Sequence, residues 1–266
     1  MRMPSILAST VFAATVLGSS AALAGPLGIG LPSDPFYFDT TSSYEILVQN
    51  PGDVLRGVFT VDSIKSSLTP AIHTYDYGSG GLFLKGSFDG FILEAPIVNA
   101  NNTVTLNFHG GTLNYYVNNV NNFTISSGIP ADFAAAQSGS LWLSADAETI
   151  DAAGHTLSIT LNNATSAAVF TDASTSNALL DVTGGAAASI FDSNTFFNSQ
   201  TGTFADLLFK GSANLVTDGS CGDFGVCGSN TTKGFLLIPE PFTLSLFGAG
   251  LVGVAGLRRR KAGKKA

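Results

Sequence analysis

Between its two ends the chain alternates apolar and polar residues with a period of about two, which is the period of a β-strand and not of a helix. The segment LFLKGSFDGFILEA (82–95) follows this alternation, and so do TVTLNF (103–108) and TLNYYV (112–117). The last two segments flank the tripeptide HGG (109–111). Two alternating runs joined by a Gly-Gly turn predict a β-hairpin.

Four more segments are strand candidates: DVLRGVFTVDSI, GSLWLSA, HTLSITL and ADLLFKGSANLV. Clusters of Asn, Gly, Asp and Ser separate them, as turns require. Runs of strands without long helical patterns indicate a sandwich or a barrel rather than an α/β fold. We predict one all-β domain, a single β-sandwich or jelly roll, over residues 25–237. Residues 165–188, rich in Ala and Ser, have the weakest pattern, and we expect a long loop with one short helix there.

The N-terminus has the pattern of a secretory signal peptide. Arg2 supplies a positive charge, residues 6–18 are largely apolar, and Ala22 and Ala24 place small side chains where a signal peptidase reads them. A membrane-spanning anchor would need about twenty apolar residues. We therefore predict a signal-peptide helix over residues 1–24 with cleavage after Ala24.

The C-terminus has an uncharged segment followed by a basic tail. Residues 242–257 contain no charged side chain and as a helix would span roughly 24 Å, near the ~30 Å core of a bilayer. The tail, residues 258–266, contains six cations: Arg258, Arg259, Arg260, Lys261, Lys264 and Lys265. A buried core helix would not end in such a cluster, so we predict a single transmembrane helix whose basic tail, led by Arg258–Lys261, stays cytoplasmic.

The segment GAGLVG (248–253) is a formal dinucleotide-binding fingerprint. The fingerprint needs a βαβ unit around it and an acidic residue about twenty positions later. Only thirteen residues follow Gly253, and none of them is acidic. The glycines are better explained as small residues that allow close helix packing, and no nucleotide site is expected.

Pro239, Glu240 and Pro241 precede the uncharged segment. This tripeptide, the short apolar helix and the arginine cluster together resemble the PEP-CTERM protein-sorting domain, here residues 238–266. The resemblance implies recognition by an exosortase, a membrane-embedded cysteine protease of the transpeptidase type, and removal of the tail near the tripeptide. It further implies a Gram-negative bacterium that makes exopolysaccharide, transient anchoring in the inner membrane, and delivery to the cell surface or extracellular matrix.

Removal of both ends makes the remaining body strongly acidic. Seven of the twelve basic residues lie in the ends, so five basic and nineteen acidic residues remain, a net charge near −14. Such a polyanion repels nucleic acid and anionic lipid, which excludes them as expected partners. Neutral polysaccharide and divalent cations are compatible with this charge.

Cys221 and Cys227 are the two cysteines of the chain. In an exported protein this spacing predicts a local disulfide. The alternative, a zinc site, lacks a nearby histidine. His73, His109 and His155 lie in three separate segments without metal-ligand spacing, and His109 lies beside the predicted turn. We expect surface or turn-packing roles for them and assign no metal ligand and no cofactor.

The acidic pairs Asp146–Glu148 and Glu148–Asp151 have the residue types of glycosidase carboxylates or calcium ligands. Exposed acids in an acidic protein are usually solvated, and we expect that here. Tyrosine and tryptophan side chains could form a carbohydrate-stacking platform, but we expect them to fill the sheet interior. The candidates are Tyr44, Tyr75, Tyr77, Tyr115, Tyr116 and Trp142.

The function predicted from these patterns is that of a non-enzymatic exported protein of the cell surface or extracellular matrix, associated with exopolysaccharide in biofilm or floc. Two alternatives remain open: a secreted polysaccharide-active enzyme, and a calcium- or carbohydrate-binding module. Two carboxylates about 5–10 Å apart in an aromatic-lined cleft would favour the enzyme. A flat surface rich in Ser, Thr and Asn would favour the matrix role.

Overall fold

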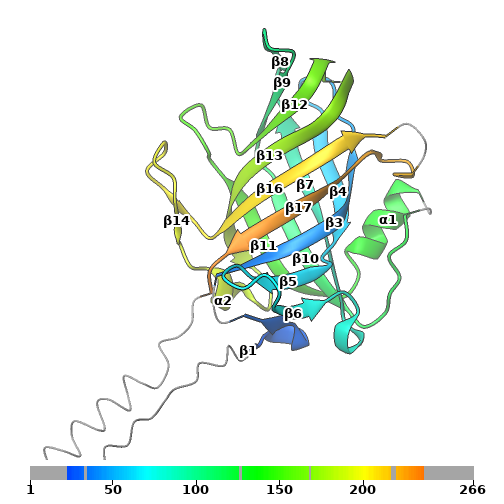
Figure 1. The fold of residues 1–266 in the computed structure, drawn as a ribbon, viewed down its shortest axis with the longest axis vertical. Helices are drawn as coiled ribbons and strands as arrows, with labels where there is room; N and C mark the ends of the chain where they lie inside the picture. The colour runs from blue at the N-terminus through cyan, green and yellow to red at the C-terminus, as the bar shows by residue number, and fades with distance from the viewer. Residues whose placement is uncertain (1–22, 33–34, 126–127, 168, 217–219, 237–266) are drawn as a thin grey trace, which may run out of the picture.

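The computed structural model describes residues 23–32, 35–125, 128–167, 169–216 and 220–236 (Figure 1). Ten longer strands form its main sheet: β3 (Phe36–Ile46), β4 (Val54–Thr60), β7 (Phe83–Leu93), β9 (Val104–His109), β10 (Thr112–Asn118), β11 (Ser140–Glu148), β12 (Leu157–Ser166), β13 (Val169–Gly184), β16 (Leu207–Leu215) and β17 (Gly225–Gly234). Short strands accompany them: β1 (Leu23–Ala24), β2 (Gly30–Leu31), β5 (Ser63–Ser66), β6 (His73–Asp76), β8 (Ile97–Val98), β14 (Phe196–Phe197) and β15 (Phe204–Ala205). The helices are α1 (Ile129–Ala136) and α2 (Ala188–Phe191), with single turns at Pro26–Gly28 and Ser79–Gly81.

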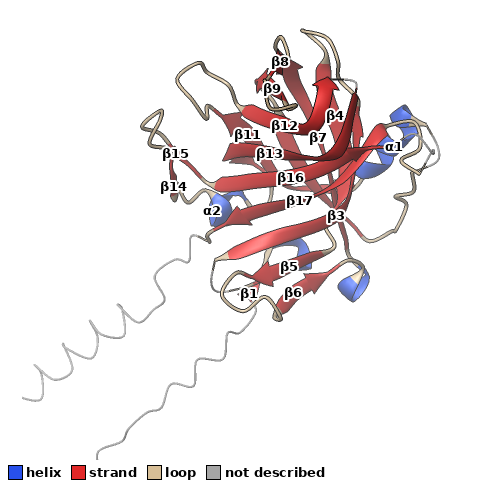
Figure 2. Ribbon diagram, turned by 45° about the horizontal axis from the view of Figure 1, so that its top comes forward, coloured by secondary structure: helices blue, strands red, loops and turns tan. Residues whose placement is uncertain are grey.

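The main sheet closes on itself. Within the described residues, eight strands pair antiparallel in a ring, in the order β3, β4, β7, β10, β11, β13, β16 and β17, and β17 pairs again with β3. The strands follow one another around the ring in chain order, so the molecule is a closed eight-stranded up-and-down barrel (Figure 2). The predicted sandwich or jelly roll is therefore wrong. Alternation specifies one apolar face for each strand, but it does not say whether the first and last strands meet.

The predicted hairpin at Gly110–Gly111 is also wrong, because β9 and β10 do not pair with each other. Both pair with β7 in one unbroken register, with Phe108 opposite Leu93 and Thr112 opposite Asp89. They are two halves of one bent strand. Gly110 and Gly111 have φ values of 67° and 105°, which other residues rarely adopt, and they produce the bend.

A matching irregularity lies in the next strand around the barrel. Glu148 of β11 pairs with Leu179, and Leu157 of β12 pairs with the adjacent Ala178, so residues 149–156 are a loop that leaves the wall. Beyond it, β13 occupies most of residues 165–188, where we expected a long loop. The short helix expected within this range is not there; α2 begins at Ala188, the last residue of the range.

The barrel interior is packed with aromatic rings that lie over glycines. Phe38, Tyr115 and Trp142 contact one another, and Phe191 of α2 packs against Phe38 and Trp142. In three cross-strand pairs a phenyl ring covers a glycine: Phe88 opposite Gly57, Phe59 opposite Gly86, and Phe36 opposite Gly234. A missing Cβ leaves room for the ring of the partner strand, which explains how a chain with 30 Gly and 20 Phe fills a narrow barrel. Of the six aromatic candidates for a carbohydrate platform, Tyr75, Tyr115 and Trp142 belong to this core, as the expected filling of the sheet requires.

Both chain ends of the barrel are tied to its wall. Near the N-terminus, Trp142 Nε1 donates to the Pro26 carbonyl oxygen at 3.0 Å, and Ile29 and Leu31 are fully buried. Near the C-terminus, Phe224 joins a second apolar cluster with Val58 and with Ala136 of α1, outside the wall. Figure 1 shows α1 lying beside the barrel.

Several sequence predictions lie outside the described residues. These are the signal peptide up to residue 22 and the sorting region, residues 238–266, with the proposed transmembrane helix over residues 242–257. No helix among the described residues has the length and apolarity needed to cross a membrane.

Glu45 of β3 borders two interior cavities of about 30 Å³ each, which Leu55 and Ile159 also line. The Ser43 hydroxyl donates to its carboxyl at 3.4 Å. Removal from water raises the pKa of Glu45 to about 7, against a smaller lowering by the Ser43 hydrogen bond. Each cavity has room for a water molecule but not for an organic ligand.

We expect Gly86→Ala to destabilise the barrel. A Cβ at Gly86 would lie closer than 3.0 Å to the Phe59 ring and the Asn114 carbonyl oxygen, so the free energy of unfolding should fall by about 1–3 kcal/mol. Gly184→Ala is the matched control, because its Cβ would meet nothing nearer than Ser144 Cβ at 3.8 Å. Urea denaturation measures both variants, and equal unfolding free energies would contradict the packing described here.

We expect Glu45→Gln to stabilise the protein above neutral pH. The folded pKa of about 7 lies above the ordinary 4.5, so the wild type loses stability as pH rises from 4.5 through 7. The difference between these pKa values corresponds to about 3 kcal/mol at pH 8. At pH 4 both side chains are neutral, and denaturation there provides the internal control. A difference between the two proteins that does not change between pH 4 and pH 8 would refute this assignment.

Candidate functional site

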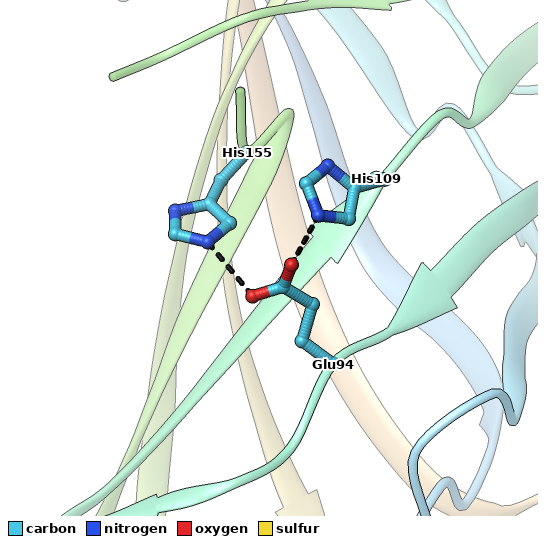
Figure 3. Close-up of side chains that lie close together, drawn as sticks. All are labelled: Glu94, His109 and His155. Atoms are coloured by element: carbon cyan, nitrogen blue, oxygen red, sulfur yellow. Dashed lines mark hydrogen bonds and ion pairs between the residues drawn. The ribbon is translucent and has the colours of Figure 1, made fainter. Parts of the chain in front are cut away.

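Glu94, His109 and His155 meet on the outer surface of the barrel at the two irregularities of the wall (Figure 3). Glu94 follows β7, His109 is the last residue of β9, and His155 lies at the end of the loop 149–156. Strand β9 pairs with both β7 and β12, and this pairing brings the three segments together. In β9 the buried residues are Val104, Leu106 and Phe108, so alternation turns His109 outward.

The carboxylate of Glu94 bridges the two imidazole rings. Its Oε1 contacts His109 Nε2, and its Oε2 lies 2.9 Å from His155 Nε2. The other ring nitrogens also have partners: His109 Nδ1 lies 2.9 Å from the Gly154 carbonyl oxygen, and His155 Nδ1 lies 2.6 Å from Asp151 Oδ2. Every polar atom of both rings is therefore used within one cluster, which we call the Glu94 cluster.

The loop that holds His155 is fixed by Asp151. Asp151 Oδ1 accepts hydrogen bonds from the backbone N–H groups of Ala153 and His155, at 3.0 and 3.2 Å. The loop is closed by a backbone hydrogen bond from Ile150 N–H to the His155 carbonyl oxygen at 2.7 Å. His155 is the most enclosed member, with 13% of its side chain exposed, against 41% for His109 and 42% for Glu94.

The hydrogen bonds of the cluster favour the ionised form of Glu94 and the protonated forms of both histidines. The hydrogen bonds to His109 and then to His155 lower the pKa of Glu94. The hydrogen bond to Glu94, followed by that to the Gly154 carbonyl, raises the pKa of His109. For His155, burial lowers the pKa, but the hydrogen bonds to Asp151 and Glu94 together outweigh it and raise the value. Two imidazoles and a carboxylate that converge in this way can hold protons or a metal ion.

Of the acidic pairs singled out in the sequence, Asp146 and Glu148 share one face of β11, and Asp151 lies apart from them in the loop 149–156. Asp151 binds His155, whereas Asp146 lies on β11 opposite Asp181 of β13. Burial, followed by a hydrogen bond to Asp206, raises the pKa of Asp181 to about 6. Asp206 accepts hydrogen bonds from three backbone N–H groups, those of Val182, Ser193 and Asn194, at 2.6–2.7 Å. Its carboxylate therefore holds a loop in place.

The other predicted site residues are placed as follows. Ala24 lies in β1 opposite Gly30. Cys221 and Cys227 are disulfide-bonded, with Cα atoms 5.7 Å apart. Ala22, the tripeptide Pro239–Pro241 and the basic residues Arg258–Lys261 lie outside the described residues.

No sequence pattern indicated the Glu94 cluster, and we assigned no metal ligand from the sequence. His109 is followed by Gly110 and His155 is preceded by Gly154, so both histidines lie where a strand is interrupted. A glycine next to a histidine is a weak signal, because it does not show which strand ends lie side by side in the folded protein. The hairpin that we expected at Gly110 would have paired β9 with β10 and left His155 elsewhere.

Comparison with known proteins locates the sorting signal. Residues 237–261 match the PEP-CTERM protein-sorting motif. Neither a curated protein nor a solved structure matches the chain. The motif implies processing by exosortase, which is a membrane protein. The chain thus carries a PEP-CTERM sorting signal, which indicates an exported protein targeted to exosortase and supports a cell-surface or extracellular destination.

Proposed function

We propose that the processed barrel is a non-enzymatic matrix protein that binds an acidic exopolysaccharide in the biofilm or floc of a Gram-negative bacterium. Before processing, the sorting region holds the precursor transiently at the inner membrane. The observation that carries this proposal is a depression on the outer wall, about 330 Å³ in volume, which combines an aromatic ring, hydroxyls and two ammonium groups.

The depression lies over strands β3, β17 and β16, which run side by side in Figure 1. Its lining residues are Tyr37, Ser67, Leu208, Lys210, Thr231 and Lys233. Lys233 is the direct cross-strand partner of Tyr37, and Lys210 is that of Thr231. We call this surface the Tyr37 depression. Its volume is within the range of sites for small organic ligands, and a tyrosine ring can pack against the C–H face of a sugar.

Positive charge gathers at this depression although the body as a whole is acidic. Of the five basic residues outside the two ends, Lys210 and Lys233 line it, and Lys65 lies 5.9 Å from the Tyr37 ring. Lys65 forms an ion pair with Asp39 at 2.6 Å, whereas Lys210 and Lys233 are exposed and have no ion pair among the described residues. Two exposed ammonium groups favour a ligand with carboxylates, so the proposed ligand is an acidic polysaccharide in place of the neutral one that net charge alone suggested.

The wall beside the depression is polar and continuous. One cross-strand row runs over five neighbouring strands, in the order Asn107, Ser158, Asn177, Lys210 and Thr231. All five side chains are at least partly exposed. Amide and hydroxyl groups both donate and accept hydrogen bonds, so such a row complements the hydroxyls of a long sugar chain. This supports attachment along a polymer rather than capture of one small molecule.

The double variant Lys210→Ala/Lys233→Ala should bind alginate, an acidic polysaccharide, roughly tenfold more weakly than the wild type. Each exposed charge contact contributes up to about 1 kcal/mol, and the interaction should weaken with added salt. Affinity electrophoresis in alginate gels measures the change, with neutral dextran gels for comparison. Arg56→Ala is the control, since Arg56 lies on β4 over the Phe133 ring, away from the depression. Equal retardation of the double variant and the wild type would contradict the proposed site.

Exosortase processing should be visible at the C-terminus of the protein. Mass spectrometry of protein from cells that contain the exosortase should show a chain that ends near Pro239–Pro241. Cells that lack the enzyme should retain the sequence through Ala266. An intact C-terminus in both kinds of cell would contradict processing, whatever the outcome of the alginate experiment.

A further inference from the structure

We propose that Glu94, His109 and His155 form a binding site for a divalent transition metal ion of the Zn²⁺ class. The ligands are the two Nε2 atoms and the Glu94 carboxylate, and a fourth position faces solvent. These ligand atoms all lie within 4.8 Å of one another. The site shares no residue with the Tyr37 depression, so it does not depend on the proposed function.

The hydrogen bonds of the rings decide which nitrogens can bind a metal. His109 Nδ1 faces the Gly154 carbonyl oxygen, and His155 Nδ1 faces the Asp151 carboxylate. Both partners are acceptors only, so each Nδ1 carries the proton. In the neutral ring the lone pair is then on Nε2. Both lone pairs point at oxygens of the Glu94 carboxylate.

With this protonation each Nε2 lone pair faces a carboxylate oxygen of Glu94, so two hydrogen-bond acceptors meet unless a cation lies between them. Two protons satisfy it, one on each ring, and so does one metal ion in the middle. Ligand atoms about 2.0–2.1 Å from a tetrahedral Zn²⁺ lie about 3.3 Å apart. The Glu94 side chain is 42% exposed at the edge of the barrel, so it is free to withdraw from the rings toward this spacing.

The groups behind the ligands are those that metal sites use. A histidine ligand usually donates its second N–H to a carboxylate or a backbone carbonyl, which fixes the ring and strengthens the metal bond. His155 has the carboxylate of Asp151, and His109 has the carbonyl of Gly154. Asp151 is itself held by two backbone N–H groups. The rings are therefore oriented before any metal arrives.

The ligand types select the class of metal. Two imidazole nitrogens and one carboxylate suit zinc, copper, nickel or iron, whereas calcium requires six to eight oxygen ligands. The acidic body attracts divalent cations in general, and the two histidine ligands make the site prefer a transition metal to calcium. A bound ion would connect β7, β9 and the loop 149–156, and so close the wall where its strands are interrupted.

The experiment uses the full chain without a tag, freed of metal by chelation and dialysed against Zn²⁺. Mass spectrometry of the metal content should give one tightly bound ion per chain. Co²⁺ in place of Zn²⁺ should give the visible absorption of a four-coordinate site. His109→Ala and His155→Ala should each reduce affinity at least tenfold and remove that absorption. His73→Ala is the matched control, because His73 pairs with Asp76 on β6 and should leave both readouts unchanged.

Asp151→Asn tests the site without removing a ligand. It should lower zinc affinity about 10- to 100-fold while one ion per chain still binds at saturation. Circular dichroism of each variant confirms that the barrel is folded. The proposal is overturned if the wild type binds no zinc at 100-fold excess, or if the His109 and His155 variants bind it as the His73 variant does.

Discussion

The antiparallel pairing of β17 with β3 joins the last long strand of the barrel to the first, and the rest of the structure depends on it. The pair extends from Phe36 opposite Gly234 to Ile46 opposite Gly225. Because the ring is closed, the main barrel strands have partners on both sides, and one set of side chains is enclosed. A closed ring of eight strands has little interior space. The Phe–Gly pairs make this small interior easier to pack, because each glycine lacks a side chain at the position where a phenyl ring of the neighbouring strand lies.

Closure also determines where chemistry can occur. The interior holds aromatic rings and the carboxyl of Glu45, whose raised pKa shows how poorly this space accommodates charge. Groups able to bind ligands therefore lie on the outer wall. The Glu94 cluster lies where a bent strand and a protruding loop break the ladder, and such breaks turn side chains toward one another. The proposed metal site thus lies on irregular wall, whereas the Tyr37 depression lies on regularly paired strands.

The outer wall has two regions of different electrostatic character. At the Glu94 cluster, carboxylates surround two histidines and favour cations. At the Tyr37 depression, Lys210 and Lys233 provide positive charge on a body that is otherwise acidic. The PEP-CTERM signal supports delivery to the cell surface or extracellular space, and there, we propose, one region binds an acidic polymer and the other a metal ion. The two regions share no residue, so each can be tested without disturbing the other.

The sequence by itself indicated seven of the ten long strands and the sorting signal at the C-terminus, but it indicated neither β13 nor the two strands that close the barrel, β3 and β17. Alternation and the tripeptide Pro239–Pro241 are local patterns, and local patterns can be seen in a sequence. Only the tertiary structure decided that the sheet closes, that β9 and β10 are one bent strand, and that Glu94, His109 and His155 meet. Each of these rests on pairing between residues distant in the chain, as with Phe36 and Gly234. Alternation repeats every two residues and is therefore the same for many possible partners, so it cannot select one register among them.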